Sequence, residues 1–388
     1  MMKKIKNSEI VSLIKSIYSA SDDEYIALHE PKFISDEKDI LNNCIDSTYV
    51  STIGEYVTKF EENIKDFTGA KHVISTSNGT SALHISMIAA GVNPKDEVIT
   101  QAFTFVATCN AIKYCYADPV FVDISKNSLG MCPNSLINWL HSNTEKRKGT
   151  LFNKNTGAKV TAVLPMHTFG HSCEIKNIQE ICKEFNLTLI EDAAEALGSY
   201  YDNKHLGTYG DIGTLSFNGN KIITTGGGGA VITNSDIIAN KVRHLSTTAR
   251  LKTKYTFDHD QIGYNYRMPN LNASLGIAQL KKLEFFIDKK RELASTYYKY
   301  FEGSEINFFN EPENAKSNYW LNALIFKSEF ERNNALEYTN NNNVMTRPPW
   351  KLMTKLKMFS HCQKSDIANS EDLEGRILNI PSSVPIKN

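Results

Sequence analysis

Lys221 has the clearest chemical context in this sequence, because it lies between a short strand-like segment and a run of glycines. The stretch reads SFNGNKIITTGGGGAVIT from residue 216 to residue 233. A lysine amine forms a Schiff base with an aldehyde when it is close to that group and partly desolvated. Gly226–Gly229 permit close backbone approach. A lysine alone is usually a solvated surface group, and the glycines alone could form a tight hairpin, but together they favour a reactive amine.

A second candidate is the turn STSNGTSALH, where a strand ends and a helix begins. Gly79 and Thr80 stand at the start of this helix, where free backbone N–H groups favour an anion. Ser216, on the strand before Lys221, could reach the same anion, so these residues predict a phosphate site. The turn matches neither GxxxxGK[ST] nor GxGxxG, so a Walker site or a dinucleotide fingerprint is unsupported. An ordinary helix cap is the alternative interpretation.

Acidic and aromatic side chains follow two further strands, in LTLIEDAAEALG and QAFTFVATCNA. Asp192 could hold the cationic ring nitrogen of a pyridinium cofactor, whereas Glu191 is better explained as a helix-capping acid. Phe105 or Phe103 could lie flat on a planar ring, although a core position is the default for either. In chain order the four segments provide a phosphate cup, a stacking aromatic, an acid and a lysine, which are the parts of a pyridoxal 5'-phosphate site.

The elements that must position these residues follow a regular pattern. From about residue 70, short apolar strands alternate with helical segments, which predicts βαβ units and a mostly parallel sheet covered on both faces. The segments GTLSFN and GGAVIT follow one another without a long helix, so part of the sheet should be antiparallel. In such sheets ligands bind outside the carboxyl ends of the strands, so the four segments should converge there.

The domain organisation follows from the long helical stretch 270–301, which has the length of a connector. We predict an α/β protein with an N-terminal helical extension (1–30), a large cofactor-binding domain (31–275), and the connecting helix with a small C-terminal domain (276–388). The extension has Ile10, Leu13, Ile14 and Ile17 at helical spacing. It should therefore be an amphipathic helix that packs on its own chain, and a partner-binding helix is the alternative.

The composition excludes several classes of protein. Lys plus Arg and Asp plus Glu both number 43, without long blocks of one sign, so nucleic acid and anionic membranes are not expected partners. The seven cysteines lack a CxxC pair, which argues against a disulfide framework and a structural zinc site. No apolar run is long enough for a signal peptide or a membrane span. We expect a cytoplasmic protein without a bound metal.

Five segments carry a resemblance to a known family: SNGTSALH, EDAAEALGS, GTLSFNGNKIITTGGGGA, IGYNYRMPNLNASLGIAQL and TRPPWKLM. From about residue 30 the chain resembles the DegT/DnrJ/EryC1/StrS family of sugar aminotransferases. The resemblance implies fold type I of the pyridoxal phosphate enzymes, with a large domain whose mixed, mostly parallel sheet is sandwiched by helices. It also implies a homodimer with shared active sites.

The resemblance assigns roles to individual residues. Lys221 would bind the cofactor aldehyde covalently and act as the catalytic base. The remaining cofactor contacts would be Asp192 at the ring nitrogen, Glu195 near the ring hydroxyl, Phe105 on the ring face, and Gly79, Thr80 and Ser216 at the phosphate. Asn265 would reach the phosphate of the neighbouring subunit.

Three further residues match segments near the substrate in similar enzymes. Arg347 and Trp350 match the segment that approaches the nucleotide sugar. His167 aligns with a histidine near the cofactor, and a structural role for it is the alternative.

Within the family the segment LHEPKFISDEKDILNNCIDSTYVSTIGEYVTKFE and the N-terminal helix look most like the LegC subgroup, with PglE-type enzymes next. The implied reaction moves the amino group of L-glutamate to UDP-4-keto-6-deoxy-N-acetylglucosamine, giving UDP-4-amino-4,6-dideoxy-N-acetylglucosamine for legionaminic acid, bacillosamine or related glycans. A sugar dehydratase on the same scaffold is one alternative, although such relatives usually replace the lysine with histidine. A non-catalytic ligand sensor is another.

Overall fold

The computed structural model describes residues 3–386, and a seven-stranded sheet forms its centre. Across the sheet the order is β1 (His72–Thr76), β11 (Gly229–Thr233), β10 (Ile212–Ser216), β7 (Thr188–Asp192), β6 (Val160–Leu164), β2 (Glu97–Gln101) and β3 (Asp118–Val122). Strand β11 is antiparallel to both β1 and β10, and the other neighbours are parallel. The mixed, mostly parallel sheet predicted from the strand spacing is therefore confirmed.

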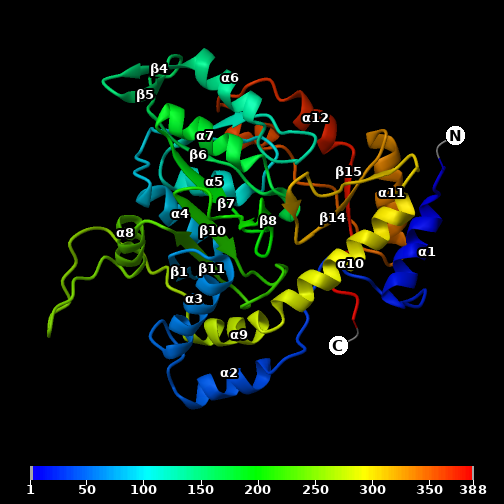
Figure 1. Cartoon of the computed structure of the whole chain (residues 1–388), viewed down its shortest axis with the longest axis horizontal. Helices are drawn as coiled ribbons and strands as arrows, with labels where there is room; N and C mark the ends of the chain where they lie inside the picture. Colours follow the sequence, from blue (N-terminus) through cyan, green and yellow to red (C-terminus); the bar gives the residue numbers. More distant parts are fainter. Residues whose placement is uncertain (1–2, 387–388) are drawn as a thin grey trace.

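Helices cover both faces of this sheet (Figure 1). One face packs against α3 (Glu55–Thr68), α6 (Pro133–Asn143) and α7 (Ile175–Phe185), and the other packs against α4 (Gly79–Ala89), α5 (Val106–Tyr114) and α8 (Asp236–Ser246). Successive strand residues alternate between the two cores: Leu189 lies in the first and Ile190 in the second. This alternation explains why the buried strands are apolar throughout.

The predicted connector 270–301 consists of two helices, α9 (Asn270–Leu280) and α10 (Leu283–Phe301), so the expectation of one continuous helix was wrong. The break falls at Lys281 and Lys282, where Lys282 leaves helical geometry with φ −111° and ψ 3°. Helix α10 then crosses from the central sheet to a smaller sheet of β12 (Asn307–Phe308), β14 (Asn322–Ile325) and β15 (Ile377–Ile380).

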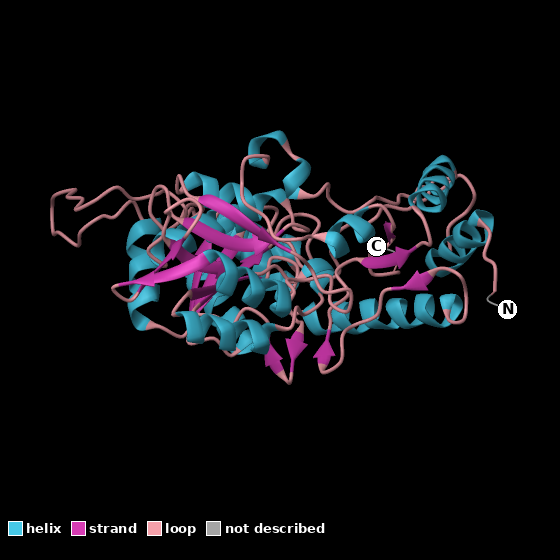
Figure 2. Ribbon diagram, turned by 90° about the horizontal axis from the view of Figure 1, so that it is seen from above, coloured by secondary structure: helices cyan, strands magenta, loops and turns pink. Residues whose placement is uncertain are grey.

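The N-terminal helix α1 (Asn7–Tyr18) packs on its own chain, as its periodicity predicts. Ile10 and Ile14 are fully buried beside Leu293 and Tyr297 of α10. Figure 2 shows this smaller part of the molecule set apart from the central sheet along the long axis. The domain boundaries at 31–275 and 276–388 stay a prediction.

The remaining elements are short or lie at the edges. They are α2 (Glu37–Asp46), β4 (Thr144–Arg147), β5 (Thr150–Asn153), β8 (Tyr200–Tyr201), β9 (Lys204–His205), β13 (Ala315–Lys316), α11 (Glu329–Asn341) and α12 (Ala368–Glu374), with 3-10 turns at Thr168–Gly170, Met353–Lys355 and Lys357–Phe359. Across residues 3–386, none of the helices is both long and apolar enough to span a bilayer.

Candidate active site

A cavity of about 340 Å³ lies beyond the carboxyl ends of β7 and β10, beside the first turns of α4 and α5. The four segments predicted to converge all contribute to its wall. Its lining residues are Asn78, Gly79, Thr80, Leu83, Phe105, Ala107, Met166, Asp192, Ala194, Glu195, Ser216, Asn218, Asn220, Lys221, Trp320 and Trp350.

Lys221 points into this cavity from the turn after β10. Its backbone N–H donates to the Asn218 carbonyl at 2.9 Å, which fixes the start of the turn. The side chain is 12% exposed, and Nζ lies 3.4 Å from Glu195 Oε1 and 4.0 Å from the centre of the Trp320 ring. The amine is therefore held between a carboxylate and an aromatic face, away from bulk water.

Asp192 is the last residue of β7, and its carboxylate lines the cavity wall. Oδ2 accepts a hydrogen bond from the Thr108 hydroxyl at 2.7 Å, and Oδ1 accepts one from the Ala194 N–H at 3.2 Å. Burial raises the pKa of Asp192 above its ordinary value, although both hydrogen bonds oppose this. A buried acid with so few donors would be stabilised by a cationic ligand atom.

Glu195 lies one turn further along, next to the amine. Burial raises the pKa of Glu195 to about 7, against the opposing effect of the nearby Lys221 charge. Its other oxygen, Oε2, accepts a hydrogen bond from the Phe169 N–H at 2.9 Å. This carboxyl can therefore take up or release a proton beside Lys221 near neutral pH.

The first turn of α4 forms the opposite end of the cavity. The Asn78 side chain accepts from the Ser81 N–H at 2.7 Å and caps the helix. Gly79 and Thr80 occupy the first two helical positions, where backbone N–H groups have no intrahelical acceptor. A Cβ at Gly79 would lie 2.9 Å from Ser216 Cβ, so only glycine lets the turn approach β10 this closely. Two N–H groups and a hydroxyl converge there, which suits a phosphate.

The glycine run serves this close approach. Gly226 has φ +79°, a left-handed conformation that favours glycine. A Cβ at Gly229 would lie 2.6 Å from the Asn78 carbonyl group. The run therefore lets β11 pass directly beneath the start of α4.

The choice between the two phenylalanines is decided by their positions. Phe103 is 1% exposed and packs edge-on against Phe169 in the core, whereas Phe105 is 45% exposed and lines the cavity. Trp350 also lines the cavity, and its ring centre lies 6.0 Å from those of Phe103 and Phe105. Only Phe105 is placed to face a flat ligand.

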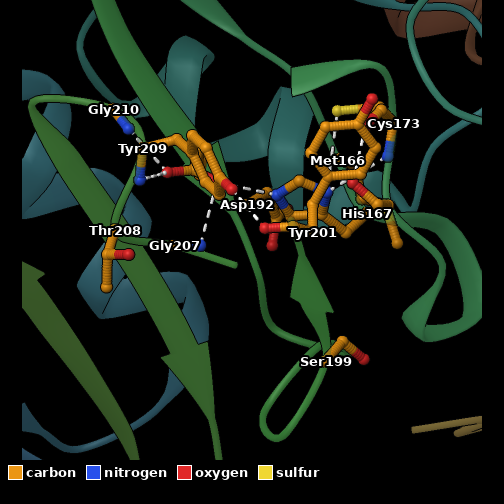
Figure 3. A network of polar contacts seen from close by, with 12 residues as sticks. Met166, His167, Cys173, Asp192, Ser199, Tyr201, Gly207, Thr208, Tyr209 and Gly210 are labelled. Carbon is orange, nitrogen blue, oxygen red and sulfur yellow. Dashed lines mark hydrogen bonds and ion pairs between the residues drawn. The ribbon is translucent and has the colours of Figure 1, made fainter. Parts of the chain in front are cut away.

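Neither His167 nor Glu191 is among the residues that line the cavity. Figure 3 shows His167 in a network of polar contacts with Cys173 beside it. His167 Nε2 is 2.9 Å from Glu191 Oε2, and both side chains are fully buried. Burial alone would lower the pKa of His167, but the Cys173 sulfur and the Glu191 carboxylate raise it to about 10. This placement corresponds to the structural alternative for His167 and offers no contact with a substrate in the cavity.

Glu191 is satisfied by a loop and not by a helix N-terminus. Its two oxygens accept from the N–H groups of Gly207, Tyr209 and Gly210 at 2.8, 2.7 and 2.6 Å. The prediction that Glu191 caps a helix was therefore wrong. This acid instead accepts hydrogen bonds from the loop before β10.

Asn265 and Arg347 are exposed and do not line the cavity of this chain. The Asn265 backbone forms a bridge with Thr247. Arg347 exchanges backbone hydrogen bonds with Asn379 of β15, at 3.1 and 2.8 Å. Neither side chain reaches Lys221 within one chain.

Sequence reasoning missed two side chains that contact the predicted residues Lys221 and Asp192. Trp320, in the segment YWLNALIF, reads as a core residue of a strand, yet its ring borders Lys221. Thr108 stands three residues after Phe105 on the first turn of α5, and this spacing was the available signal for its contact with Asp192.

The donor set of this cavity fits pyridoxal 5'-phosphate. An N–H and hydroxyl cup suits the phosphate, the buried Asp192 carboxylate suits a protonated ring nitrogen, and the Lys221 amine suits the aldehyde. Phe105 provides an aromatic face for the ring between these ends.

Known proteins are similar to this chain along most of its length. The model of the DegT/DnrJ/EryC1/StrS aminotransferase family matches residues 31–388. A GDP-perosamine synthase of Vibrio cholerae is 38% identical over 360 residues, covering 92% of this chain and 94% of the relative. A GDP-perosamine synthase of Escherichia coli O157:H7 is 36% identical, covering 94% and 95%.

A solved structure agrees with these matches. PseC of Helicobacter pylori, an aminotransferase involved in the biosynthesis of pseudoaminic acid, superposes with a TM-score of 0.83 at 25% identity, covering 92% of this chain and 94% of that one. The family predicted from the five segments is confirmed, as is fold type I. The two relatives from Vibrio cholerae and Escherichia coli are GDP-perosamine synthases and do not support the LegC assignment.

The cavity geometry and the family match together identify the chemistry. The chain belongs to the DegT/DnrJ/EryC1/StrS aminotransferase family and is a pyridoxal phosphate-dependent nucleotide-sugar aminotransferase.

Proposed function

We propose that this enzyme transfers the amino group of L-glutamate to the keto carbon of a nucleotide-linked 4-keto-6-deoxy sugar, with Lys221 as the catalytic residue. The observation that supports this most directly is the shared cavity of Lys221 and Asp192, beside an anion-binding helix start. A nucleophilic amine, a buried acid and a phosphate cup are what a transaminase needs in one place.

The cofactor contacts follow from the cavity walls. The Gly79 and Thr80 N–H groups and the Ser216 hydroxyl hold the phosphate, and Phe105 covers one ring face. Asp192 pairs with the ring nitrogen, and Thr108 keeps that carboxylate in position through its 2.7 Å hydrogen bond.

Pyridoxal 5'-phosphate, when bound, supplies the aldehyde and a protonated ring that draws electrons from the reacting carbon. The protons are moved by this chain. Lys221 Nζ removes the proton from the α-carbon of glutamate and later delivers a proton to the former keto carbon of the sugar. Glu195, 3.4 Å away, accepts a hydrogen bond from the Lys221 ammonium and orients it between these steps.

A second copy of the chain completes the site in this proposal. Asn265 is exposed and outside the cavity of its own chain, which is compatible with a contact to the phosphate end of a partner. The enzyme then works as a homodimer with shared active sites. Arg347 and Trp350 would contact the nucleotide sugar, and of these two Trp350 lines the cavity.

The nucleotide is proposed from the relatives. GDP-perosamine synthases match more than nine tenths of the chain, which supports a GDP-linked keto sugar. UDP-4-keto-6-deoxy-N-acetylglucosamine is the second candidate, supported by the resemblance of the segment LHEPKFISDEKDILNNCIDSTYVSTIGEYVTKFE to the LegC and PglE groups.

The decisive experiment pairs glutamate with GDP-, UDP- and dTDP-linked 4-keto-6-deoxy sugars and reads 2-oxoglutarate release and the NMR spectrum of the sugar. The cofactor-loaded protein should also lose its absorbance band near the edge of the visible when glutamate is added. Lys221→Ala should reduce turnover by at least about 10³-fold, whereas Lys241→Ala, at an exposed lysine of α8, should leave it unchanged.

Each rival function has its own outcome in this experiment. Loss of water from the sugar without amine transfer would support the dehydratase. Bound cofactor without 2-oxoglutarate would support the sensor. A Lys221→Ala protein that still turns over would remove the basis of the proposal.

A further inference from the structure

Lys290 is a fully buried lysine on α10 whose contacts join three distant parts of the chain. Lys290 is 1% exposed. Nζ donates to His29 Nε2 at 2.9 Å, to the Trp320 carbonyl at 3.2 Å and to the Ser382 carbonyl. Burying an ammonium is costly unless its protons are bonded, and here three acceptors meet that requirement. Burial lowers the pKa of Lys290 to about 7.

This arrangement leaves one ring nitrogen of His29 without a hydrogen-bond partner among the described residues. An ammonium only donates, so His29 Nε2 accepts and the ring proton sits on Nδ1. Nδ1 is buried without a hydrogen-bond partner among residues 3–386. Leaving such a donor unpaired destabilises a fold, which suggests that the position of the ring serves another purpose. The ring also packs against Trp320, with centres 6.4 Å apart.

Trp320 carries this contact through to the active site. Its backbone carbonyl is bonded by Lys290, and its ring packs on His29. The indole Nε1–H donates to the Asn220 carbonyl at 2.6 Å, one residue before Lys221. The centre of the same ring lies 4.0 Å from Lys221 Nζ. Lys290 thus holds the Trp320 backbone, His29 packs against the Trp320 ring, and that ring contacts the reactive amine.

We propose that Lys290 is a positioning residue that acts through His29 and Trp320 to hold the Lys221 amine where it reacts. The proposal rests on the proposed function of Lys221. It gives the N-terminal segment a role, because His29 belongs to the extension that precedes the large domain. A displacement of about 1 Å in a reacting group can reduce a rate by about 10²-fold, so support at this distance has a measurable effect.

The test compares Lys290→Met with Lys289→Met, its neighbour on α10. Lys289 is partly exposed, pairs with Glu292 at 2.7 Å and lies 6.0 Å from the centre of the Phe285 ring. The first readout needs no turnover: cofactor-stripped protein is mixed with pyridoxal 5'-phosphate, trapped with borohydride, and the labelled Lys221 peptide is quantified by mass over time. Lys290→Met should label about 10- to 100-fold more slowly, and Lys289→Met should match the unchanged protein.

A second readout separates positioning from loss of fold. With Lys290→Met, kcat for the glutamate half-reaction should fall by a similar factor while KM for glutamate changes less than about twofold, because Lys290 does not touch the substrate. A folded Lys290→Met protein with unchanged labelling and kcat would overturn the proposal.

His29 provides an independent pair of variants if Lys290→Met does not fold. His29→Gln keeps an acceptor near the position of Nε2, whereas His29→Leu removes it. His29→Leu should slow the labelling of Lys221 about tenfold, and His29→Gln should restore most of the rate. Equal rates for the two variants would mean that bulk and not the hydrogen bond matters, which would also overturn the proposal.

Failure of the underlying function gives a different result. If the unchanged protein attaches pyridoxal 5'-phosphate at another lysine, or not at all, the role of Lys221 falls. If Lys221 is labelled normally in every variant, only the positioning role of Lys290 falls.

Discussion

Glu191 and Asp192 are neighbours on β7, yet they have opposite surroundings. Glu191 accepts three backbone N–H groups of one loop and contacts His167. Asp192 accepts one hydroxyl and one N–H group and faces the cavity. Adjacent strand residues point to opposite faces of a sheet. Asp192 therefore faces the cavity, whereas Glu191, one residue earlier, does not.

The two acids also differ in how readily they ionise. Burial acts to raise the pKa of Glu191, but the bonds from His167 and the loop outweigh it, and the pKa is lowered. Burial raises the pKa of Asp192, and its few bonds do not compensate. A fully bonded acid stabilises the fold, whereas a poorly bonded one keeps its binding capacity for a ligand. This contrast distinguishes structural from functional acids in the same strand.

The largest expected effect is the loss of activity on substitution of Asp192. Asp192→Asn should reduce the rate of the glutamate half-reaction by about 10²- to 10⁴-fold, because the amide cannot keep the ring nitrogen protonated. Stability in the absence of cofactor should not fall, since the raised pKa means that ionising this carboxyl costs the folded state free energy. Stopped-flow absorbance and thermal unfolding measure the two effects. A fully active Asn variant would contradict the assignment of Asp192.

Substitution of Glu191 should show the reverse pattern, with a large loss of stability and a small loss of activity. Glu191→Gln leaves His167 buried without its partner charge and offers an NH₂ group to backbone donors, so the free energy of unfolding should fall by about 4 kcal/mol. Urea unfolding measures this loss, and Glu180→Gln, at an exposed position of α7, is the control. Activity per folded molecule should fall far less than with Asp192→Asn. A large loss of activity with unchanged stability would place Glu191 among the functional residues.

Glu195 should affect the stability of the fold in a way that depends on pH. Its pKa of about 7 lies above the ordinary value of 4.5, so between these pH values the folded protein holds a proton that the unfolded chain releases. Stability from this group is therefore lost as the pH rises through that window, by about 3 kcal/mol. Glu195→Gln should become progressively more stable than the unchanged protein from pH 4.5 to 7, with a constant difference above. Equal slopes for the two proteins in cofactor-free unfolding would exclude a raised pKa.

Much of this arrangement could be predicted from the sequence because it depends on local patterns. Short apolar strands and the turns after them located β7, β10 and the start of α4, and these bring Asp192, Lys221 and Gly79 to one cavity. The break between α9 and α10 was missed because Lys281 and Lys282 carry no proline or glycine signal.

Trp320 could not be predicted because its role depends on distant contacts. Its indole bonds a carbonyl 100 residues away in sequence, and its backbone is held by Lys290. Nothing in YWLNALIF distinguishes this tryptophan from a core residue. Positions set by tertiary contacts leave no local pattern to read.

The smallest expected effects concern Phe103 and Phe105. Like Glu191 and Asp192, these two residues differ in whether they line the cavity. Phe105→Leu should weaken pyridoxal 5'-phosphate binding by about 1 kcal/mol, or about fivefold in Kd, because a stacking face is lost at the cavity. Phe103→Leu, in the core, should instead lower the free energy of unfolding by about 1 kcal/mol and leave Kd unchanged. Absorbance titration and urea unfolding measure these values. If Phe103→Leu weakened binding as much as Phe105→Leu, then burial would not distinguish support from contact at this site, and the separation drawn between Glu191 and Asp192 would lose its generality.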